Sequence, residues 1–232
     1  MITVKNLSHH FEMGKKGQKT TLPVLHDISF SINPGEIVTM IGRSGSGKST
    51  LLNLIGGFIR PVSGDITINQ QNVSSFSEAQ FADFRLDQIG FIFQNFQLIP
   101  SMTAYQNVEL PLILKGIKEA ERKEITDKTL KRVGLEDFHG HYPSELSGGQ
   151  QQRVGVARAL VLNPPIILAD EPTGSLDSET EADLLNFIQQ LNQELKITFL
   201  IITHDEQVAK IGHRTVEIQD GRLIEGGDTH AF

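Results

Sequence analysis

A glycine-rich segment directly after an apolar run constrains this chain more than any other feature. The segment is GRSGSGKST, residues 42–50, and it follows EIVTMI at 36–41. It matches G-x-x-x-x-G-K-[ST], with Gly42, Gly47 and Lys48 at fixed positions and Ser49 after them. Such small side chains let a loop wrap tightly and point several backbone N–H groups at one place, beside the start of the next helix. We therefore predict a phosphate-binding loop between a buried strand and a helix.

The loop residues have distinct predicted roles toward a nucleotide. We expect Lys48 to contact the β- and γ-phosphates and the Ser49 hydroxyl to hold Mg²⁺. The other residues of the predicted phosphate-binding loop are Arg43, Ser44, Gly45, Ser46 and Thr50. The alternative is a glycine turn without a ligand.

The remaining patterns predict an α/β fold. Continuous apolar runs at 37–41, 165–170 and 198–204 are typical of parallel core strands, with helical patterns between them at 148–163 and 179–195. The last helix is expected to place four residues on one face: Leu184, Ile188, Leu191 and Leu195. Ligands of such sheets bind at the carboxyl ends of the strands.

Other segments are expected to add two subdomains. Alternation at 2–4, 28–32 and 66–68 predicts antiparallel strands, with a hairpin loop at 12–23, and Asp220-Gly221 fits a tight turn. Residues 76–135 have a mostly helical pattern, in which Ile125, Leu130 and Val133 share a face. We predict one domain over 1–232. Its P-loop NTPase core and antiparallel β subdomain take about 1–90 and 160–232, and a helical subdomain takes about 91–159.

Two acids end the apolar run at 165–170. Asp170 is placed to bind Mg²⁺ through water, and Glu171 to polarise a water molecule against the γ-phosphate. The alternative is a strand that simply ends in solvent-facing acids.

A second helix start with anion-binding character occurs at LSGGQQQR, residues 146–153. Ser147 reads as an N-cap, and Gly148 and Gly149 permit close approach before Gln150. One nucleotide does not need both helix starts from one chain. We therefore predict two chains paired head to tail, each offering this segment to the nucleotide of the other; the alternative is a tight cap only.

Five motifs occur in an order that resembles the ATPase subunits of ABC transporters: the phosphate loop, LSGGQ, ILADEPT, SLD and THD. The segments IGRSGSGKSTLLNLIGG, SELSGGQQQRVGVARAL and ILADEPTGSLDSET resemble the macrolide-exporter, lipoprotein-release and bacitracin-resistance type, and also acetoin-utilisation transporter ATPases. The resemblance implies an ATPase that uses ATP and Mg²⁺, with an integral-membrane permease and a second copy or a paralogue as partners.

The resemblance also implies further site residues. Gln94 would contact Mg²⁺ and the attacking water, His204 would contact the γ-phosphate, and Asp177 would lie across the dimer interface. Ser147, Gly148 and Gly149 would contact the γ-phosphate bound by the partner. Phe11 stands where the family stacks an aromatic ring on adenine. The alternatives are core packing for Phe11, a solvated loop position for Gln94 and a satisfied core histidine for His204.

Composition and hydropathy restrict the partners, the compartment and the membrane association that we expect for the chain. The net charge of −7 disfavours nucleic acid as a partner, the absence of cysteine fits a reducing compartment, and no apolar stretch is long enough to cross a bilayer. We expect a cytoplasmic protein, peripheral on the inner face of the membrane. Its apolar segment after Gln94, residues 95–116 with Leu98, Ile99, Pro100 and Met102 together, is expected to receive a permease helix; the alternative is that these residues pack the helical subdomain onto its own domain. Export or extraction is favoured over import. An ATP-gated regulator that moves no cargo stays open; a DNA-repair or translation ATPase and a nucleoside-monophosphate kinase are disfavoured.

Overall fold

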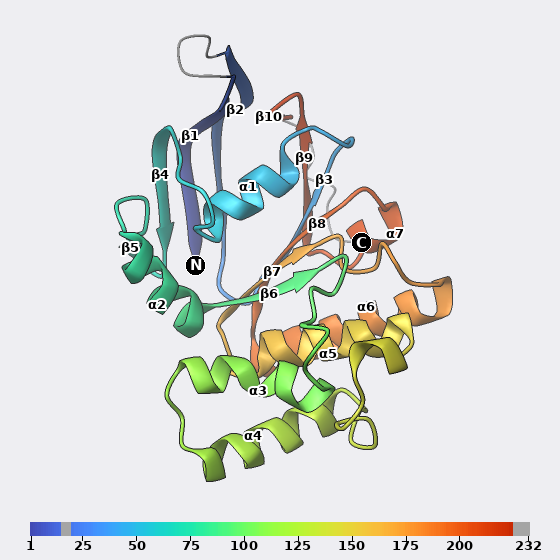
Figure 1. Ribbon diagram of the computed structural model, residues 1–232. Coiled ribbons are helices and arrows are strands. Elements are labelled where there is room, and N and C mark those ends of the chain that lie inside the picture. Colours follow the sequence, from blue (N-terminus) through green and yellow to red (C-terminus); the bar gives the residue numbers. More distant parts are fainter. Residues whose placement is uncertain (15–19, 225–232) are drawn as a thin grey trace. The chain divides into compact units, whose positions relative to one another are not determined.

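The computed structural model describes residues 1–14 and 20–224 (Figure 1). Its contacts divide the chain into two compact units. The first unit holds residues 1–82 and the chain from residue 198 onward, and the second holds residues 83–197. The predicted boundaries of a core and a helical subdomain near residues 90 and 160 remain a prediction.

The antiparallel strands predicted for the first unit are confirmed. Four strands pair in the order β2-β1-β4-β5: β1 (Ile2–Met13), β2 (Thr20–Ile32), β4 (Ser63–Ile68) and β5 (Gln71–Asn72). Ile2 lies opposite Ile32 and Ile68, and all three are buried. The hairpin loop expected at 12–23 is shorter than predicted, because residues 12–13 and 20–23 continue the ladder; residues 15–19 of that prediction lie outside the described part.

A second group of strands in the first unit is mainly parallel. β3 (Ile37–Ile41) pairs in parallel with β8 (Thr198–Thr203) and with β9 (Arg214–Gln219). β9 turns through Asp220 and Gly221, with φ of 47° and 73°, into the antiparallel β10 (Arg222–Leu223), which confirms the tight turn. α1 (Lys48–Ile55) follows β3, and the short α7 (Glu206–Ala209) follows β8.

The second unit contains a parallel strand pair and helices. β6 (Ile89–Phe93) pairs with β7 (Ile166–Asp170). The helices are α3 (Ala104–Leu114), α4 (Glu119–Arg132), the 3-10 turn η1 (Pro143–Glu145), α5 (Gly148–Leu160) and α6 (Ser178–Leu195), while α2 (Glu78–Gln88) spans the boundary between the units. The mostly helical pattern expected over 76–135 missed β6, because a five-residue apolar run has no period that separates strand from buried helix.

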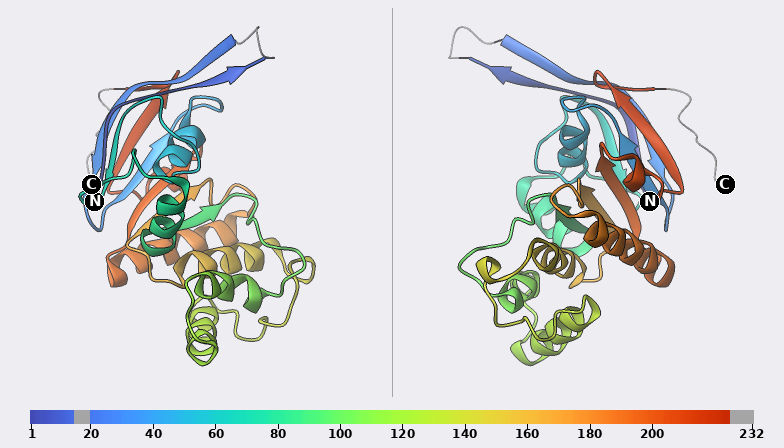
Figure 2. Two further views of the ribbon diagram at one scale, coloured as in Figure 1. Left: turned by 60° about the vertical axis from the view of Figure 1, so that its left-hand side comes forward. Right: turned by 90° about the vertical axis from the view of Figure 1, so that its right-hand side faces the viewer.

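Helices α3, α4 and α5 enclose one apolar core within the second unit (Figure 2). Leu130 and Val133 are buried in this core and Ile125 packs against it, as the shared face predicted. On α6, Leu184, Ile188 and Leu191 are buried, but Leu195 is 39% exposed. Leu195 is the last helical residue of the predicted face, and the left-handed Lys196 ends the helix there, so its side chain is less covered than those of the other three.

Candidate functional site

The predicted phosphate loop occupies the turn between β3 and α1. Its curvature requires glycine at two positions: a Cβ on Gly42 would lie 2.2 Å from the Ile218 carbonyl oxygen, and one on Gly47 would lie 2.7 Å from Leu25 Cδ2. Gly47 also has a φ of 106°, in the left-handed region that L side chains disfavour. Larger residues at either position would therefore open the loop.

Lys48 places a positive charge inside the loop. Its side chain is 6% exposed, and Nζ donates to the carbonyl oxygens of Gly42 at 2.6 Å and Arg43 at 3.1 Å. These carbonyls hold the ammonium group in place without neutralising it. The loop therefore encloses a cation at the start of a helix, where an anion is also favoured by the helix dipole.

Two further observations show that the loop fits phosphate oxygens. Ser46 Oγ is buried and has no hydrogen-bond partner among the described residues. No side chain caps the start of α1, so its first-turn N–H groups have no capping acceptor. Ser49 and Thr50 lie in this first turn, and the exposed Arg43, Ser44 and Gly45 form the rim of the loop.

His204 lies beside the phosphate loop within the first unit. In the parallel β3–β8 pair, Ile41 is the register partner of Thr203, so Gly42 and His204 follow at the same edge. His204 is exposed rather than buried, which excludes the alternative of a satisfied core histidine. Phe11 is 40% exposed on β1, so core packing is excluded for this ring too.

The second unit brings Gln94, Asp170 and Glu171 together. Asp170 ends β7, half-buried, and Glu171 follows it in a left-handed conformation with a φ of 45°. A left-handed residue with a side chain costs about 1–2 kcal/mol, and such strain concentrates at functional positions. A Cβ on Gly174 would lie 2.7 Å from Gln94 Nε2, so the Gln94 side chain covers the turn that follows Glu171.

The segment LSGGQQQR, residues 146–153, leads into α5, and Ser147 is the N-cap of this helix as expected. Ser147 Oγ accepts from the Gln150 N–H at 3.3 Å, and the Gln150 side chain accepts from the Ser147 N–H at 2.9 Å. This capping box leaves Ser147 and Gly148 exposed at the surface. The tight-cap alternative and a partner-binding role are both compatible with this geometry.

Asp177 lies next to this segment within the second unit. It is the N-cap of α6 and accepts from the Thr180 N–H at 3.0 Å and the Thr180 hydroxyl at 2.9 Å. These bonds from Thr180 lower the pKa of Asp177. A Cβ on Gly149 would lie 2.6 Å from Thr180 Cγ2, so the two helix starts touch through Thr180. Asp177, Ser147 and Gly149 therefore occupy one surface.

Three polar residues that sequence reasoning missed shape the loops of the second unit. Buried Asn107 donates to the carbonyl oxygens of Ile99, Met102 and Thr103 and accepts from the Ile99 N–H. Arg158 binds the carbonyl oxygens of Phe96 and Gln97, and burial lowers its pKa; Gln152 donates to the Pro172 carbonyl oxygen. A polar residue within an apolar helical face was the available signal for Asn107.

The predicted Mg²⁺ ligands divide between the units. Asp170 and Gln94 belong to the second unit and Ser49 to the first. Among the described residues, no group of three or more His, Asp and Glu side chains could hold a metal ion by itself. Hydroxyl, amide and carboxylate oxygens nevertheless suit Mg²⁺, whose remaining ligands in such sites are phosphate oxygens and water. In the part of the chain that is described, no helix is long and apolar enough to span a bilayer.

Comparisons with known proteins agree with this geometry. The family model described as "ABC transporter" matches residues 25–174. The "ABC transporter ATP-binding protein YtrE" of Bacillus subtilis is 61% identical, over 99% of each chain. The "Macrolide export ATP-binding/permease protein MacB" of Burkholderia pseudomallei is 44% identical, over 97% of this chain and 34% of that protein.

The fold also matches solved structures. A dimeric, post-hydrolysis structure of the ATP-binding cassette MJ0796, bound to ADP and Pi, superposes with a TM-score of 0.90. The two sequences are 41% identical, and the match covers 100% of both chains. MJ0796 is a protein of Methanocaldococcus jannaschii, described as an uncharacterized ABC transporter ATP-binding protein. The same superposition confirms the predicted fold class.

Proposed function

The chain belongs to the ABC transporter ATPases, and from that premise we propose that two copies pair head to tail around two ATP molecules to drive a membrane transporter. As a member of this family it is an ATPase subunit of a transporter, with ATP and Mg²⁺ as its ligands. The observation that carries the pairing is the exposed second helix start at Ser147 and Gly148. That start is accessible to a nucleotide held by another copy.

Hydrolysis of ATP yields ADP and phosphate. In this proposal, some side chains neutralise the charge of the phosphates and others orient the attacking water. Lys48 and the N–H groups at the start of α1 neutralise the phosphates. Glu171 accepts the proton of the attacking water, and His204 holds that water against the γ-phosphate. Ser49, Gln94 and Asp170 would hold Mg²⁺, which neutralises charge on the β- and γ-phosphates when bound.

In this proposal, the ATPase acts on a membrane permease that binds it. The segment at 98–102 offers half-buried apolar side chains, and buried Asn107 fixes its backbone. A preformed apolar surface of this kind suits a short helix from a membrane subunit. Similarity to a macrolide export protein favours export or extraction over import. The ATPase would then be peripheral on the cytoplasmic face of the membrane.

Complementation between two inactive variants tests the pairing. Lys48→Ala removes the loop cation, and Ser147→Arg blocks the second helix start. A mixed pair contains one intact site only if each site takes its loop from one copy and its Ser147 from the other. We expect ATP and Mg²⁺ to produce dimers in the mixture but not in either variant alone, measured by light scattering. Equal, monomeric scattering in all three samples would rule out the shared site.

Cargo movement distinguishes the transporter from a regulator. The ATPase with its co-purified permease is placed in vesicles, and ATP-dependent accumulation of candidate export substrates is measured. Transport that disappears in Glu171→Gln supports the transporter. ATP-dependent dimerisation that changes the permease while no cargo moves would support the regulatory alternative instead.

A further inference from the structure

Glu171 adopts a backbone conformation that its own sequence does not favour. Its φ is 45°, in the left-handed region, and a proline follows it. A left-handed residue with a side chain costs free energy, and a residue before proline is ordinarily extended. The Gly174 N–H donates to the Glu171 carbonyl oxygen at 3.1 Å, and this bond closes a turn whose central residues are Pro172 and Thr173. The conformation of Glu171 therefore requires support from outside the turn.

Gln152 on helix α5 supplies such support. Its side-chain Nε2 donates to the carbonyl oxygen of Pro172, the residue directly after Glu171. Gln152 is 1% exposed and Pro172 is buried as well, so water does not compete for this bond. The turn is thus held, one residue beyond Glu171, by a side chain that lies 20 positions earlier in the sequence.

The bond to Pro172 explains why an amide occupies position 152. The Oε1 atom of Gln152 is buried and has no hydrogen-bond partner among the described residues. Burying an amide oxygen without a partner costs free energy that an apolar side chain at the same position would not cost. Packing alone would therefore be served better by an apolar residue, but such a residue has no donor for the Pro172 carbonyl oxygen.

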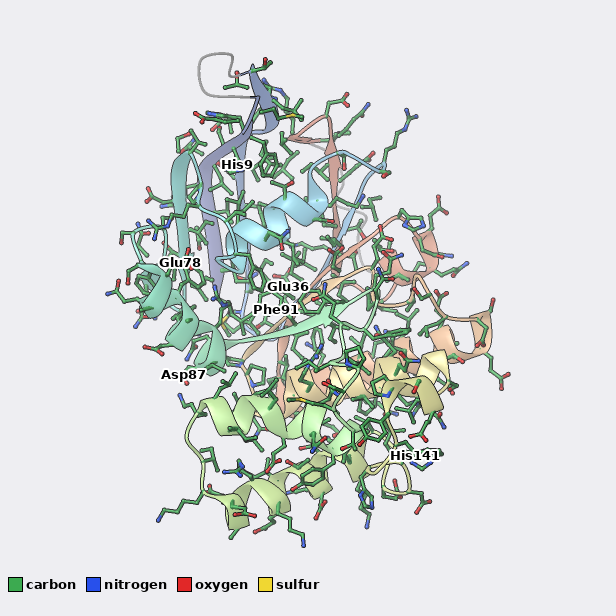
Figure 3. All side chains as sticks on the ribbon, in the orientation of Figure 1. His9, Glu36, Glu78, Asp87, Phe91 and His141 are labelled. Atoms are coloured by element: carbon green, nitrogen blue, oxygen red, sulfur yellow. The ribbon has the colours of Figure 1, made fainter. Side chains whose placement is uncertain are left out.

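Helix α5 is a firm base for this bond. The backbone of Gly90 in β6 lies so close to the Ala159 carbonyl oxygen of α5 that no Cβ fits between them. β6 pairs with β7, from which the turn emerges; Figure 3 labels Phe91 in the middle of β6, and its register partner on β7 is Leu168. The supporting helix is thereby fixed to the same pair of strands that precedes the turn. A group held from a regular element is placed more precisely than one held from a loop.

We propose that Gln152 is a positioning residue for hydrolysis, whose amide holds the Pro172 carbonyl and so keeps Glu171 in the left-handed conformation from which its carboxylate reaches the attacking water. The inference rests on the proposed function in one respect: Glu171 is taken as the group that accepts the proton of that water. Gln152 itself touches neither the nucleotide nor the water in this scheme. Lys48 and the phosphate loop belong to the other unit and keep their own contacts.

Steady-state phosphate release tests the proposal, with kcat and KM for ATP measured in each variant. Gln152→Met has nearly the same volume but no donor, and Gln152→Asn keeps an amide on a side chain that is one methylene shorter. Asn192→Leu is the matched control, because Asn192 is a buried amide of the same unit and donates to the Ile197 carbonyl oxygen at 2.7 Å, near the end of α6. Calorimetric titration with ATP counts the binding-competent molecules, and thermal unfolding confirms that each variant is folded.

We expect kcat to fall about ten- to hundredfold in both Gln152 variants, because misplacing a catalytic group by about 1 Å can slow a reaction by up to roughly hundredfold. The KM and the affinity for ATP should stay unchanged. Asn192→Leu should keep the original kcat per binding-competent molecule, although it also loses a buried hydrogen bond. The split between kcat and KM, read against this control, separates positioning from a loss of folded protein.

A double-mutant cycle shows whether Gln152 acts through Glu171. In the Glu171→Gln background the proton acceptor is already absent, so adding Gln152→Met should lower the residual rate of phosphate release no further. A residue that supports the unit in general would lower the rate by the same factor in both backgrounds.

Three results would overturn the proposal. An unchanged kcat in both Gln152 variants would show that the turn does not need the bond, an equal factor of loss in both backgrounds would show an effect that bypasses Glu171, and an equal loss in Asn192→Leu would show a general weakening of the unit. Original turnover in Glu171→Gln would instead refute Glu171 as the proton acceptor. Lost turnover there, with unchanged Gln152 variants, would refute only the role of Gln152.

Discussion

Phe93 and Asp170 are register partners in the parallel β6–β7 pair. Gln94 and Glu171 are therefore the first residues after the two strands at the same edge, although they lie 77 positions apart in sequence. The Gln94 side chain covers Gly174, three residues after Glu171. A change in the loop that begins at Gln94 would therefore reach the turn that follows Glu171, at Gly174.

Replacing Glu171 by Gln should stop turnover while ATP still binds. The amide keeps the size of the side chain but cannot accept a proton, and loss of a general base typically slows a reaction roughly 100- to 10,000-fold. Phosphate release and ATP affinity are the measurements, with Glu179→Gln on the exposed start of α6 as the matched control. A variant that hydrolyses ATP at the original rate would remove Glu171 from the proposed mechanism.

Replacing Lys48 by Ala should weaken ATP binding itself. The buried ammonium is the charged donor inside the loop, and a hydrogen bond to a charged group contributes about 1.5–3 kcal/mol, or about ten- to hundredfold in affinity. Calorimetry with ATP measures the loss. Lys5→Ala, an exposed lysine on β1, should bind like the original protein. Unchanged affinity in Lys48→Ala would contradict the phosphate-loop role.

Replacing Leu98 and Ile99 by Asp should detach the ATPase from its permease. Two carboxylates would have to be desolvated in an apolar contact with a membrane subunit, which strongly disfavours binding. Co-purification from detergent-solubilised membranes is the readout, and ATP binding by the detached variant shows that it is folded. Leu195→Asp, at the exposed end of α6, is the control. Undisturbed co-purification of the double variant would refute docking at 98–102.

Replacing Asn107 by Ala should destabilise the second unit and loosen the segment at 98–103. The change removes three donated bonds and leaves the Ile99 N–H without its acceptor, at an expected cost of about 1–3 kcal/mol. Denaturant unfolding measures this cost. Gln106→Ala, one residue away on the exposed side of α3, loses only a capping contact and should cost less. Equal effects would mean that Asn107 does not anchor the segment.

The local patterns of the sequence determined the family motifs, the elements around them and the chemistry of each site residue. The serine cap of α5 and the acids at the end of β7 occupy positions that spacing along the chain predicts. Gly42 and Gly47 fit the loop motif as well, but the contacts that require glycine there come from the distant Ile218 and Leu25. The same reasoning was wrong where a segment was too short to show a period, as for β6.

Only the tertiary structure decided which distant residues meet. Strand register places His204 beside Gly42, and Gln94 beside Glu171, and no local pattern encodes that alignment. Burial likewise separated the buried His9 from the half-buried His10 beside it, although the sequence presents them as an equivalent pair. The physical reason is that register and burial arise from contacts summed over the whole core, whereas helix capping and tight turns depend on a few consecutive residues.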